Sequence, residues 1–348
     1  MKKIIIIGTG WYGLHIFLFI KKYYKNFKLI IVEENNEIFN NSSNFNQNRL
    51  HIGYHYPRSH RTREICKNNY KKFINNYREI VDFIDKNYYC ISKESIIDYK
   101  TYIKIYSNDE MFVHNTIFNN VLENIDGNFI NTKEKIINSI KAKKYFKRQI
   151  NKKYIKFNYK VNAITTKHNK IIINNDLECD ILLDCTYNKL GLQSNCIYEL
   201  TISLIYVKSN YIPFDSLTIM DGNFFSLFPR DLKKNIYTLT HVKYTPLIKS
   251  ENIKDIMNYS ITPEKVLEVK KNMETDVIKY YMNFVKDFKY HSYFTSYKCK
   301  SNSNNDNRDC HILQKNNIIS VNCGKITGIY EFENYIKKYL DSYNGIET

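Results

Sequence analysis

The chain has 348 residues, which is enough for a large hydrophobic core and about two domains. Its net charge of +17 comes from 52 basic against 35 acidic residues. The basic residues are 44 lysines and eight arginines, and their even spread argues against a nucleic-acid or membrane-surface partner. No apolar run approaches the roughly 18 residues of a membrane-spanning helix.

The eight cysteines form no CxxC pair and show no metal-ligand spacing with histidine. In a chain of this length, scattered cysteines are typical of reduced thiols in a cytosol-like compartment. The start, Lys2-Lys3 followed by isoleucines, imitates a signal peptide, but a glycine motif interrupts the apolar run. We therefore expect a cytoplasmic protein without a bound metal.

A strand, a glycine turn and a helix are predicted at the beginning of the chain. Residues 4–7 form a β-branched run into Gly8-x-Gly10-x-x-Gly13, and an apolar segment over residues 14–20 follows. Gly8 permits a sharp turn, Gly10 lets the backbone approach a pyrophosphate, and Gly13 lets the helix pack closely on the strand. We expect the phosphates of a dinucleotide at the N-terminus of this helix.

A carboxylate follows the second predicted strand. Residues 29–32 are apolar and mostly β-branched, and Glu33 comes directly after them. A carboxylate at this position accepts hydrogen bonds from both hydroxyls of an adenosine ribose and disfavours a 2′-phosphate. The first 33 residues therefore predict a dinucleotide site that is unsuited to NADP.

The segment over residues 46–63, NQNRLHIGYHYPRSHRTR, concentrates arginine and histidine. It holds four of the eight arginines and three of the nine histidines. Guanidinium groups bind carboxylate or phosphate in a planar, bidentate way, and imidazole titrates near neutral pH. We predict a loop that binds an anionic substrate or cofactor oxygens, although a surface loop with capping roles remains open. The candidate catalytic residues are Arg49, His51, His55, Arg58 and Arg308.

The other elements are predicted from periodicity, capping residues and turn residues. Helices are expected over residues 64–87, 132–149 with Thr132 as N-cap, 262–288 with Thr262 as N-cap, and 330–339. Strands are expected over residues 88–105, 153–173, 180–188, 198–207, 217–245 and 318–321, with a turn at 229–231. The glycine-bearing turn over residues 322–328 offers a second helix N-terminus to a ligand.

These motifs resemble the FAD-dependent oxidoreductases of the D-amino-acid oxidase superfamily. The order of elements agrees over most of the chain, and residues 4–63, 180–191 and 316–333 carry the matching motifs. The resemblance implies that the first glycine turn binds the ADP half of FAD, and that the loop over 42–53 and the turn after 321 line the flavin. The implied FAD contacts are Gly8, Gly10, Trp11, Tyr12, Gly13, Glu33, Glu34, Asn48, Arg49, Leu50, Val161, Cys185, Thr186, Gly324, Lys325, Ile326 and Thr327.

An α/β fold is expected: a Rossmann-like FAD/NAD(P)-binding domain with a three-layer, parallel sheet, and an inserted antiparallel β-rich substrate domain. The expected FAD-binding domain comprises residues 1–80, 130–198 and 300–348. The expected substrate domain comprises residues 81–129 and 199–299.

The expected activity is hydride transfer to FAD from a small polar or anionic substrate: an amine, amino acid, hydroxy acid or sugar derivative. The C-terminal glycine signature of the family is reduced here to residues 324–328, and the loop over 46–59 is not the usual glycine-rich one. Two alternatives stay open, a flavin-dependent sugar-nucleotide mutase-like enzyme and a non-catalytic dinucleotide-binding module. Covalent attachment of the flavin to His51 or Cys323 is a further alternative.

Overall fold

The computed structural model describes residues 1–108, 112–115, 121–302 and 309–345. Contacts divide the chain into two compact units, and each unit is discontinuous in sequence. Unit 1 comprises Met1–Asn44, Ser139–Tyr198 and Lys298–Thr348. Unit 2 comprises Phe45–Asn138 and Glu199–Tyr297.

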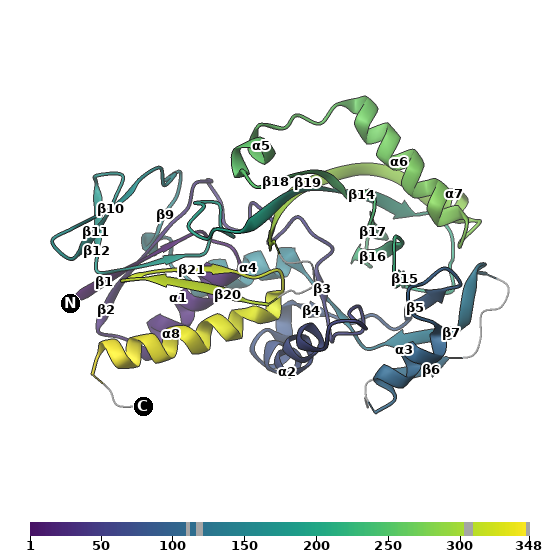
Figure 1. Cartoon of the computed structure of the whole chain (residues 1–348), viewed down its shortest axis with the longest axis horizontal. Coiled ribbons are helices and arrows are strands. Elements are labelled where there is room, and N and C mark those ends of the chain that lie inside the picture. The colour runs from purple at the N-terminus through teal and green to yellow at the C-terminus, as the bar shows by residue number, and fades with distance from the viewer. Residues whose placement is uncertain (109–111, 116–120, 303–308, 346–348) are drawn as a thin grey trace. The chain divides into compact units, whose positions relative to one another are not determined.

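Unit 1 is built on a six-stranded sheet in the order β20-β21-β13-β1-β2-β9 (Figure 1). Five strands run parallel, and only β20 pairs antiparallel, with β21. The strands are β1 (Lys2–Ile7), β2 (Phe27–Val32), β9 (Ile155–Lys156), β13 (Ile181–Asp184), β20 (His311–Lys315) and β21 (Ile318–Asn322). Strand β1 is an inner strand that pairs with β13 and β2 on its two edges. Its isoleucines are buried on both faces of the sheet, which explains the continuous apolar run.

Both faces of this sheet are packed, which gives unit 1 three layers. On one face, Ile5 and Ile7 pack against Ile171 and Ile173 of a separate three-stranded sheet. On the other face, Ile6 lies against helix α1 (Trp11–Tyr23). The small sheet has the order β10 (Ile164–Lys167), β11 (Lys170–Ile173), β12 (Leu177–Cys179). The helices are α1 (Trp11–Tyr23), α4 (Ser139–Gln149), η2 (Lys152–Tyr154), η3 (Ile326–Gly328) and α8 (Ile329–Tyr343). The expected α/β class with a parallel sheet is confirmed.

Helices α1 and α8 lie side by side, although more than 300 residues separate them (Figure 1). Nε2 of His15 is 2.9 Å from Oε2 of Glu333, and the Tyr24 hydroxyl donates to Oδ1 of Asp341 at 2.6 Å. These polar contacts fix the C-terminal helix beside the glycine turn.

Unit 2 is dominated by a nine-stranded sheet in the order β18-β14-β17-β16-β15-β5-β7-β6, with β19 paired to β14. Its strands are β5 (Asn87–Ser92), β6 (Phe112–Asn115), β7 (Ile125–Thr132), β14 (Cys196–Lys208), β15 (Ser216–Met220), β16 (Phe225–Asp231), β17 (Ile236–His241), β18 (Pro246–Ser250) and β19 (Phe288–Ser301). Strands β5 and β15 run parallel, and the pairs β14–β17, β15–β16, β16–β17, β5–β7 and β6–β7 are antiparallel. The expected antiparallel β-rich part is therefore present.

Helix α6 (Pro263–Ile278) covers the core of this sheet. Its N-cap is Thr262, whose hydroxyl accepts from the Lys265 amide, as the sequence predicts. Val269 and Met273 pack into the apolar cluster that includes residues from β14 to β17. The other helices of unit 2 are α2 (His60–Asn76), η1 (Arg78–Ile80), α3 (Tyr99–Tyr106), α5 (Ile253–Asn258) and α7 (Phe284–Asp287).

A small sheet of three short strands belongs to unit 2 and moves the domain boundary. Its strands are β3 (Arg49–Leu50), β8 (Lys135–Ile137) and β4 (Val81–Asp82), in that order. Because β3 and β4 both pair with β8, residues 45–80 and 130–138 lie in unit 2. Both segments differ in this from the prediction, which assigns them to the dinucleotide domain.

The helix expected over residues 132–149 is wrong in its first half. Thr132 ends β7 and accepts a hydrogen bond from Nδ2 of Asn87 at 2.6 Å, so it is no N-cap. Ile136 and Ile137 then pair with β3 and β4, and the helix begins only at Ser139. Pairing with distant strands outweighs the local helical periodicity here.

Other expected bounds also change. The strands expected over 88–105 end at Ser92, and Asp98 then caps helix α3 by accepting from the Thr101 amide. The expected turn at 229–231 is part of β16, which contains a register shift there. Helix α2 ends at Asn76 and helix α6 at Ile278, earlier than expected.

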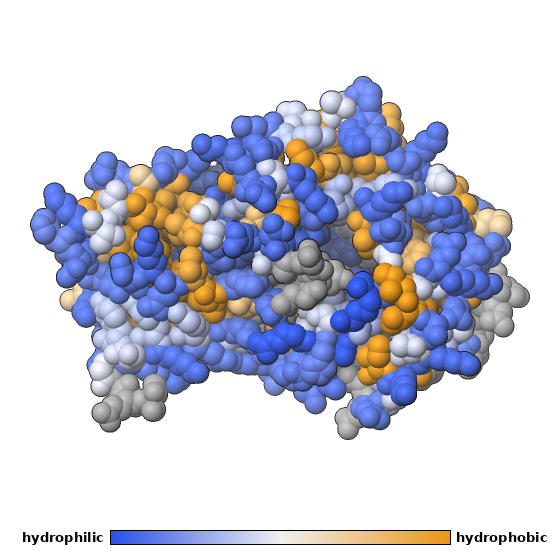
Figure 2. Space-filling model, in the orientation of Figure 1, coloured by the Kyte–Doolittle hydropathy of each residue, from blue (hydrophilic) through white to orange (hydrophobic). Residues whose placement is uncertain are grey.

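The face of the molecule in Figure 2 is largely hydrophilic, and its apolar residues gather in several separate patches. None of the helices within the described ranges is long and apolar enough to cross a membrane.

A buried histidine in unit 2 is expected to make stability depend on pH. Nδ1 of His241 accepts from the Lys243 amide at 3.1 Å, and Nε2 is 3.3 Å from Oδ2 of Asp276. Burial lowers the pKa of His241 to about 4. The unfolded chain takes up this proton at a higher pH than the folded chain. The free energy of unfolding should therefore decrease as the pH is lowered from about 6.5 to about 4.

The expected loss across that range is on the order of 3 kcal/mol, with no further contribution from this group at lower pH. Urea unfolding of the wild type and of His241→Gln at several pH values measures it. The pH slope between 6.5 and 4 should flatten in His241→Gln but not in the control His291→Gln, which removes an exposed imidazole. An unchanged slope in His241→Gln contradicts the prediction.

Candidate functional site

The first glycine turn of unit 1 requires glycine at two positions. Gly8 has φ of +100°, and an added Cβ would lie 3.0 Å from the carbonyl oxygen of Cys185. An added Cβ at Gly13 would overlap the carbonyl oxygen of Gly8. Strand β1 and helix α1 can meet this closely only with these two glycines.

The N-terminus of α1 has the features of an anion site. Gly10 is its N-cap and provides no side chain, and the first turn contains no acidic residue. The Trp11 amide donates to Oγ of Ser43 at 3.1 Å, and the Trp11 ring packs against Phe39 and Phe146. The helix dipole therefore acts on this end, and the first turn of α1 has no acidic residue of its own to neutralise it.

Glu33 lies directly after β2 and fixes the glycine turn. One carboxylate oxygen accepts from the amide and the hydroxyl of Thr9 at 2.8 and 2.6 Å. The other accepts from the amide and Nδ2 of Asn35 at 3.0 and 2.7 Å. Glu34, also an expected cofactor contact, forms an ion pair with Lys189. Glu33 is thus oriented in advance beside the turn that would hold the pyrophosphate.

Cys185 and Thr186 follow the neighbouring parallel strand β13. The Cys185 amide donates to the Ile7 carbonyl at 3.0 Å, which places this segment beside the turn. Thr186 donates through its amide and hydroxyl to Asp184, at 3.0 and 2.6 Å. Burial raises the pKa of Asp184. Val161 packs against the apolar cluster of β1, β2 and β13.

The C-terminal turn packs on the first turn of α1. The Tyr12 hydroxyl donates to the Lys325 carbonyl at 2.6 Å, and an added Cβ at Gly328 would lie 2.5 Å from the same hydroxyl. Gly328 is the N-cap of α8 and, like Gly10, provides no side chain. Unit 1 therefore brings together two helix N-termini at the carboxyl edge of its parallel sheet. Residues 324–327 lie in the connection between β21 and α8.

These residues fit the ADP half of FAD. Backbone N–H groups at a helix N-terminus with a glycine N-cap suit a pyrophosphate, and an oriented carboxylate at the end of the second strand suits a ribose. Residue 10 has no room for a side chain, since a Cβ there would lie 2.7 Å from Oγ of Ser43. The backbone N–H groups of α1 and the Glu33 carboxylate are together the groups expected at a dinucleotide site.

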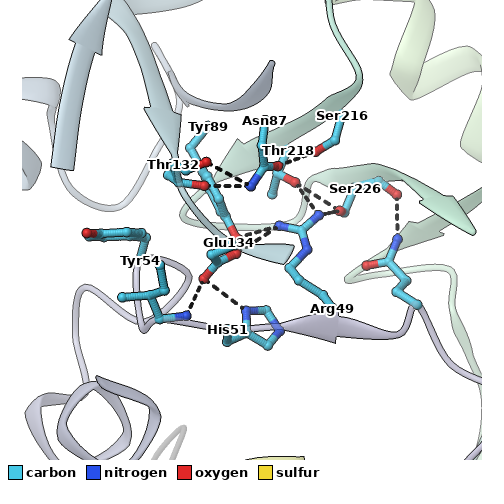
Figure 3. A network of polar contacts seen from close by, with 12 residues as sticks. Arg49, His51, Tyr54, Asn87, Tyr89, Thr132, Glu134, Ser216, Thr218 and Ser226 are labelled. Carbon is cyan, nitrogen blue, oxygen red and sulfur yellow. Dashed lines mark hydrogen bonds and ion pairs between the residues drawn. The ribbon is translucent and has the colours of Figure 1, made fainter. Parts of the chain in front are cut away.

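Unit 2 contains the other expected site residues, and Arg49 is buried in it (Figure 3). Its guanidinium donates to the hydroxyls of Tyr89, Thr218 and Ser226, the last two at 2.9 and 2.8 Å. The Phe228 ring centroid lies 4.0 Å from Cζ of Arg49. Arg49 therefore links β3 to three strands of the large sheet, in addition to any role toward a ligand.

Glu134 is the carboxylate of this network, and no motif in the sequence marks it. It is fully buried between β7 and β8 and accepts from the Ile52 amide at 2.8 Å and the Tyr89 hydroxyl at 2.5 Å (Figure 3). Nδ1 of His51 is 3.4 Å from Oε1, and Nη1 of Arg49 is 3.7 Å from Oε2. Burial alone would raise the pKa of Glu134, but His51, Arg49 and Tyr89 together hold it below its usual value.

The remaining expected residues are distributed as follows. Nε of Arg58 donates to both carboxylate oxygens of Asp221, at 3.1 and 3.0 Å. The His55 ring lies 5.5 Å from the His51 ring, measured between centroids. The Asn48 carbonyl accepts from the Ile137 amide at 2.7 Å, and Leu50 is buried in β3. Arg308 lies outside the described residues.

No family model matches the chain. Curated proteins are similar to it, among them the FAD-dependent monooxygenase FPY4 of Fusarium mangiferae, which is 27% identical over 341 residues, covering 97% of this chain and 90% of the relative. The FAD-dependent monooxygenase kojA of Aspergillus flavus is 24% identical over 358 residues, covering 93% of this chain and 82% of the relative.

Solved structures share the fold at low identity. Glycine oxidase from Geobacillus kaustophilus gives a TM-score of 0.70 at 9% identity, covering 100% of this chain and 96% of that one. L-α-glycerophosphate oxidase from Mycoplasma pneumoniae, with FAD bound, gives 0.72 at 12%, covering 96% and 94%. The amino acid oxidase NikD gives 0.74 at 7%, covering 96% and 92%. The chain therefore has the fold of these oxidases and is similar over nearly its whole length to two FAD-dependent monooxygenases.

Proposed function

We propose that the chain holds FAD at the glycine turn of unit 1 and oxidises a small polar or anionic substrate: an amine, amino acid, hydroxy acid or sugar derivative. The observation that carries the proposal is the N-terminus of α1, whose N-cap is Gly10, together with the oriented Glu33 carboxylate at the same turn. Bound FAD supplies the hydride or oxygen chemistry, and the protein supplies orientation and electrostatics.

Two side chains of unit 2 are the best candidates for handling the substrate. We assign proton acceptance to His51, because Glu134 faces its Nδ1 and so favours the tautomer with Nε2 as acceptor. We assign anion binding to Arg58, whose side chain is 43% exposed and whose guanidinium is oriented by Asp221 through its Nε edge. Arg49 is less suited, because its donors are used within the buried network.

A second candidate reaction is monooxygenation. Both curated relatives are called FAD-dependent monooxygenases, and the first is similar over 97% of this chain. The two reactions differ in what reduces the flavin. A substrate oxidase is reduced by its substrate alone, whereas a monooxygenase needs an external electron donor before it reacts with oxygen.

The visible spectrum of the purified protein tests the proposal. We expect the bands of oxidised flavin, released into the filtrate after denaturation and filtration if the attachment is non-covalent. Anaerobic addition of candidate amines, amino acids, hydroxy acids and sugar derivatives should bleach the bands of an oxidase. Bleaching by NADH or NADPH alone supports the monooxygenase instead. A colourless protein that does not take up added FAD contradicts both reactions.

A further inference from the structure

Two cysteines in unit 1 extend the register of the C-terminal hairpin. In the pair β20–β21, His311 lies opposite Asn322, and Ile312 lies opposite Val321. The next position outward places Cys310 opposite Cys323. Directly opposed residues of an antiparallel pair have Cα atoms about 4.5 to 5.5 Å apart, within the range that a disulfide spans.

Both thiols converge on the N-cap of helix α8. The sulfur of Cys310 lies 3.7 Å from the Gly328 carbonyl oxygen. The sulfur of Cys323 occupies the place where a Cβ on Gly328 would be, and it lies 3.5 Å from the Lys325 carbonyl oxygen. The two thiols share a hydrogen bond. Register and side-chain contacts therefore agree that the sulfurs face each other.

The environment gives the two thiols different roles. The hydrogen bond from Cys310 lowers the pKa of Cys323, assisted by Tyr12 and the Lys325 backbone, while burial and Glu331 oppose this. The same hydrogen bond and burial raise the pKa of Cys310. A thiolate is the reactive form of cysteine toward peroxide, and a neighbouring thiol resolves the product. Cys323 is thus suited to react first and Cys310 to resolve.

We propose that Cys310 and Cys323 are a peroxide-reactive pair that forms a reversible disulfide across the end of the C-terminal hairpin. The Cys323 thiolate attacks one oxygen of hydrogen peroxide, gives Cys323 sulfenic acid and releases hydroxide. The Cys310 thiol then attacks the sulfenic sulfur, and the disulfide forms as water leaves. Cys323 loses two electrons to the peroxide in the first step, and the second step is a condensation.

A second cysteine pair in unit 1 serves as an internal control. Cys196 and Cys299 also share a hydrogen bond, and Nδ2 of Asn322 lies 3.7 and 3.1 Å from their sulfurs. Burial and the neighbouring Cys196, however, raise the pKa of Cys299 to about 12. This pair has the same proximity, but the pKa shift of Cys299 is opposite in direction to that of Cys323.

The test uses the full-length protein as purified, treated with hydrogen peroxide at neutral pH. Free thiols are then blocked with N-ethylmaleimide, and the protein is digested without reduction for mass spectrometry. We expect a linked peptide that joins Cys310 to Cys323, reversed by dithiothreitol. In Cys310→Ser, a sulfenic acid that dimedone labels should accumulate at Cys323, whereas Cys196→Ser should leave the Cys310–Cys323 link unchanged.

Three results would overturn the proposal. The first is unreacted Cys310 and Cys323 in wild-type protein in which Cys196, the other partly exposed cysteine, is oxidised. The second is a Cys196–Cys299 link formed before any link at Cys310. The third is sulfenic acid on wild-type Cys323 that persists without a disulfide. The readout is a covalent link, so it does not depend on the flavin reaction or on the stability of a variant.

Discussion

The replacement Glu134→Ala is expected to lower the free energy of unfolding by about 3–5 kcal/mol, because it leaves the buried Arg49 guanidinium without its carboxylate. It also removes the acceptor for the Ile52 amide and the Tyr89 hydroxyl. Urea unfolding followed by circular dichroism measures the change. The isosteric Glu134→Gln should cost less, since its amide oxygen still accepts one of these hydrogen bonds.

Two further variants separate charge burial from general disruption. Glu268→Ala, which removes an exposed carboxylate paired with Lys265 on α6, should cost no more than about 1 kcal/mol. Arg49→Met combined with Glu134→Leu should recover much of the lost stability, because the buried charges disappear together. Equal costs for Glu134→Ala and Glu268→Ala would show that the network does not stabilise unit 2.

Gly13→Ala is expected to weaken FAD binding by about 100-fold, which corresponds to roughly 2–3 kcal/mol. The added methyl group overlaps the Gly8 carbonyl oxygen, so α1 must move away from the turn that approaches the pyrophosphate. Titration of the apoprotein with FAD, followed by flavin fluorescence, gives the dissociation constant.

A matched substitution controls for the loss of a glycine. Gly191 has φ of +65° and no atom within 4 Å of an added Cβ, and asparagine tolerates this backbone conformation. Gly191→Asn should therefore bind FAD as the wild type does. An unchanged dissociation constant in Gly13→Ala would mean that the close approach of α1 to β1 is not needed for FAD.

The glycine turn could be predicted because its requirements are local. Gly8, Gly13 and Glu33 follow from one strand, one turn and the next strand, and each lies where the sequence indicated. The bounds of β8 could not be predicted, because Ile136 and Ile137 form a strand only through partners from β3 and β4. Periodicity within the segment carries no information on those partners.

The concentration of arginine and histidine at residues 49–63 indicated a polar site but not its construction. The partners of Arg49 come from Tyr89, Thr218 and Ser226, which are up to 177 residues away. Glu134 lay in a segment with helical periodicity and carried no motif of its own. The 13-residue spacing of Cys310 and Cys323 likewise matches no motif, and only the hairpin register reveals the pair.

The interleaved order of the strands has a consequence for synthesis on the ribosome. In unit 1, β13 gains its second parallel neighbour only when β21 (Ile318–Asn322) has been made. In unit 2, β5 can pair with β15 only after residues 129 positions later in the chain have been made. Pairings between such distant segments form slowly and expose unpaired strand edges in the nascent chain. Both sheets are therefore completed only late in synthesis, and we expect the nascent chain to bind chaperones until then.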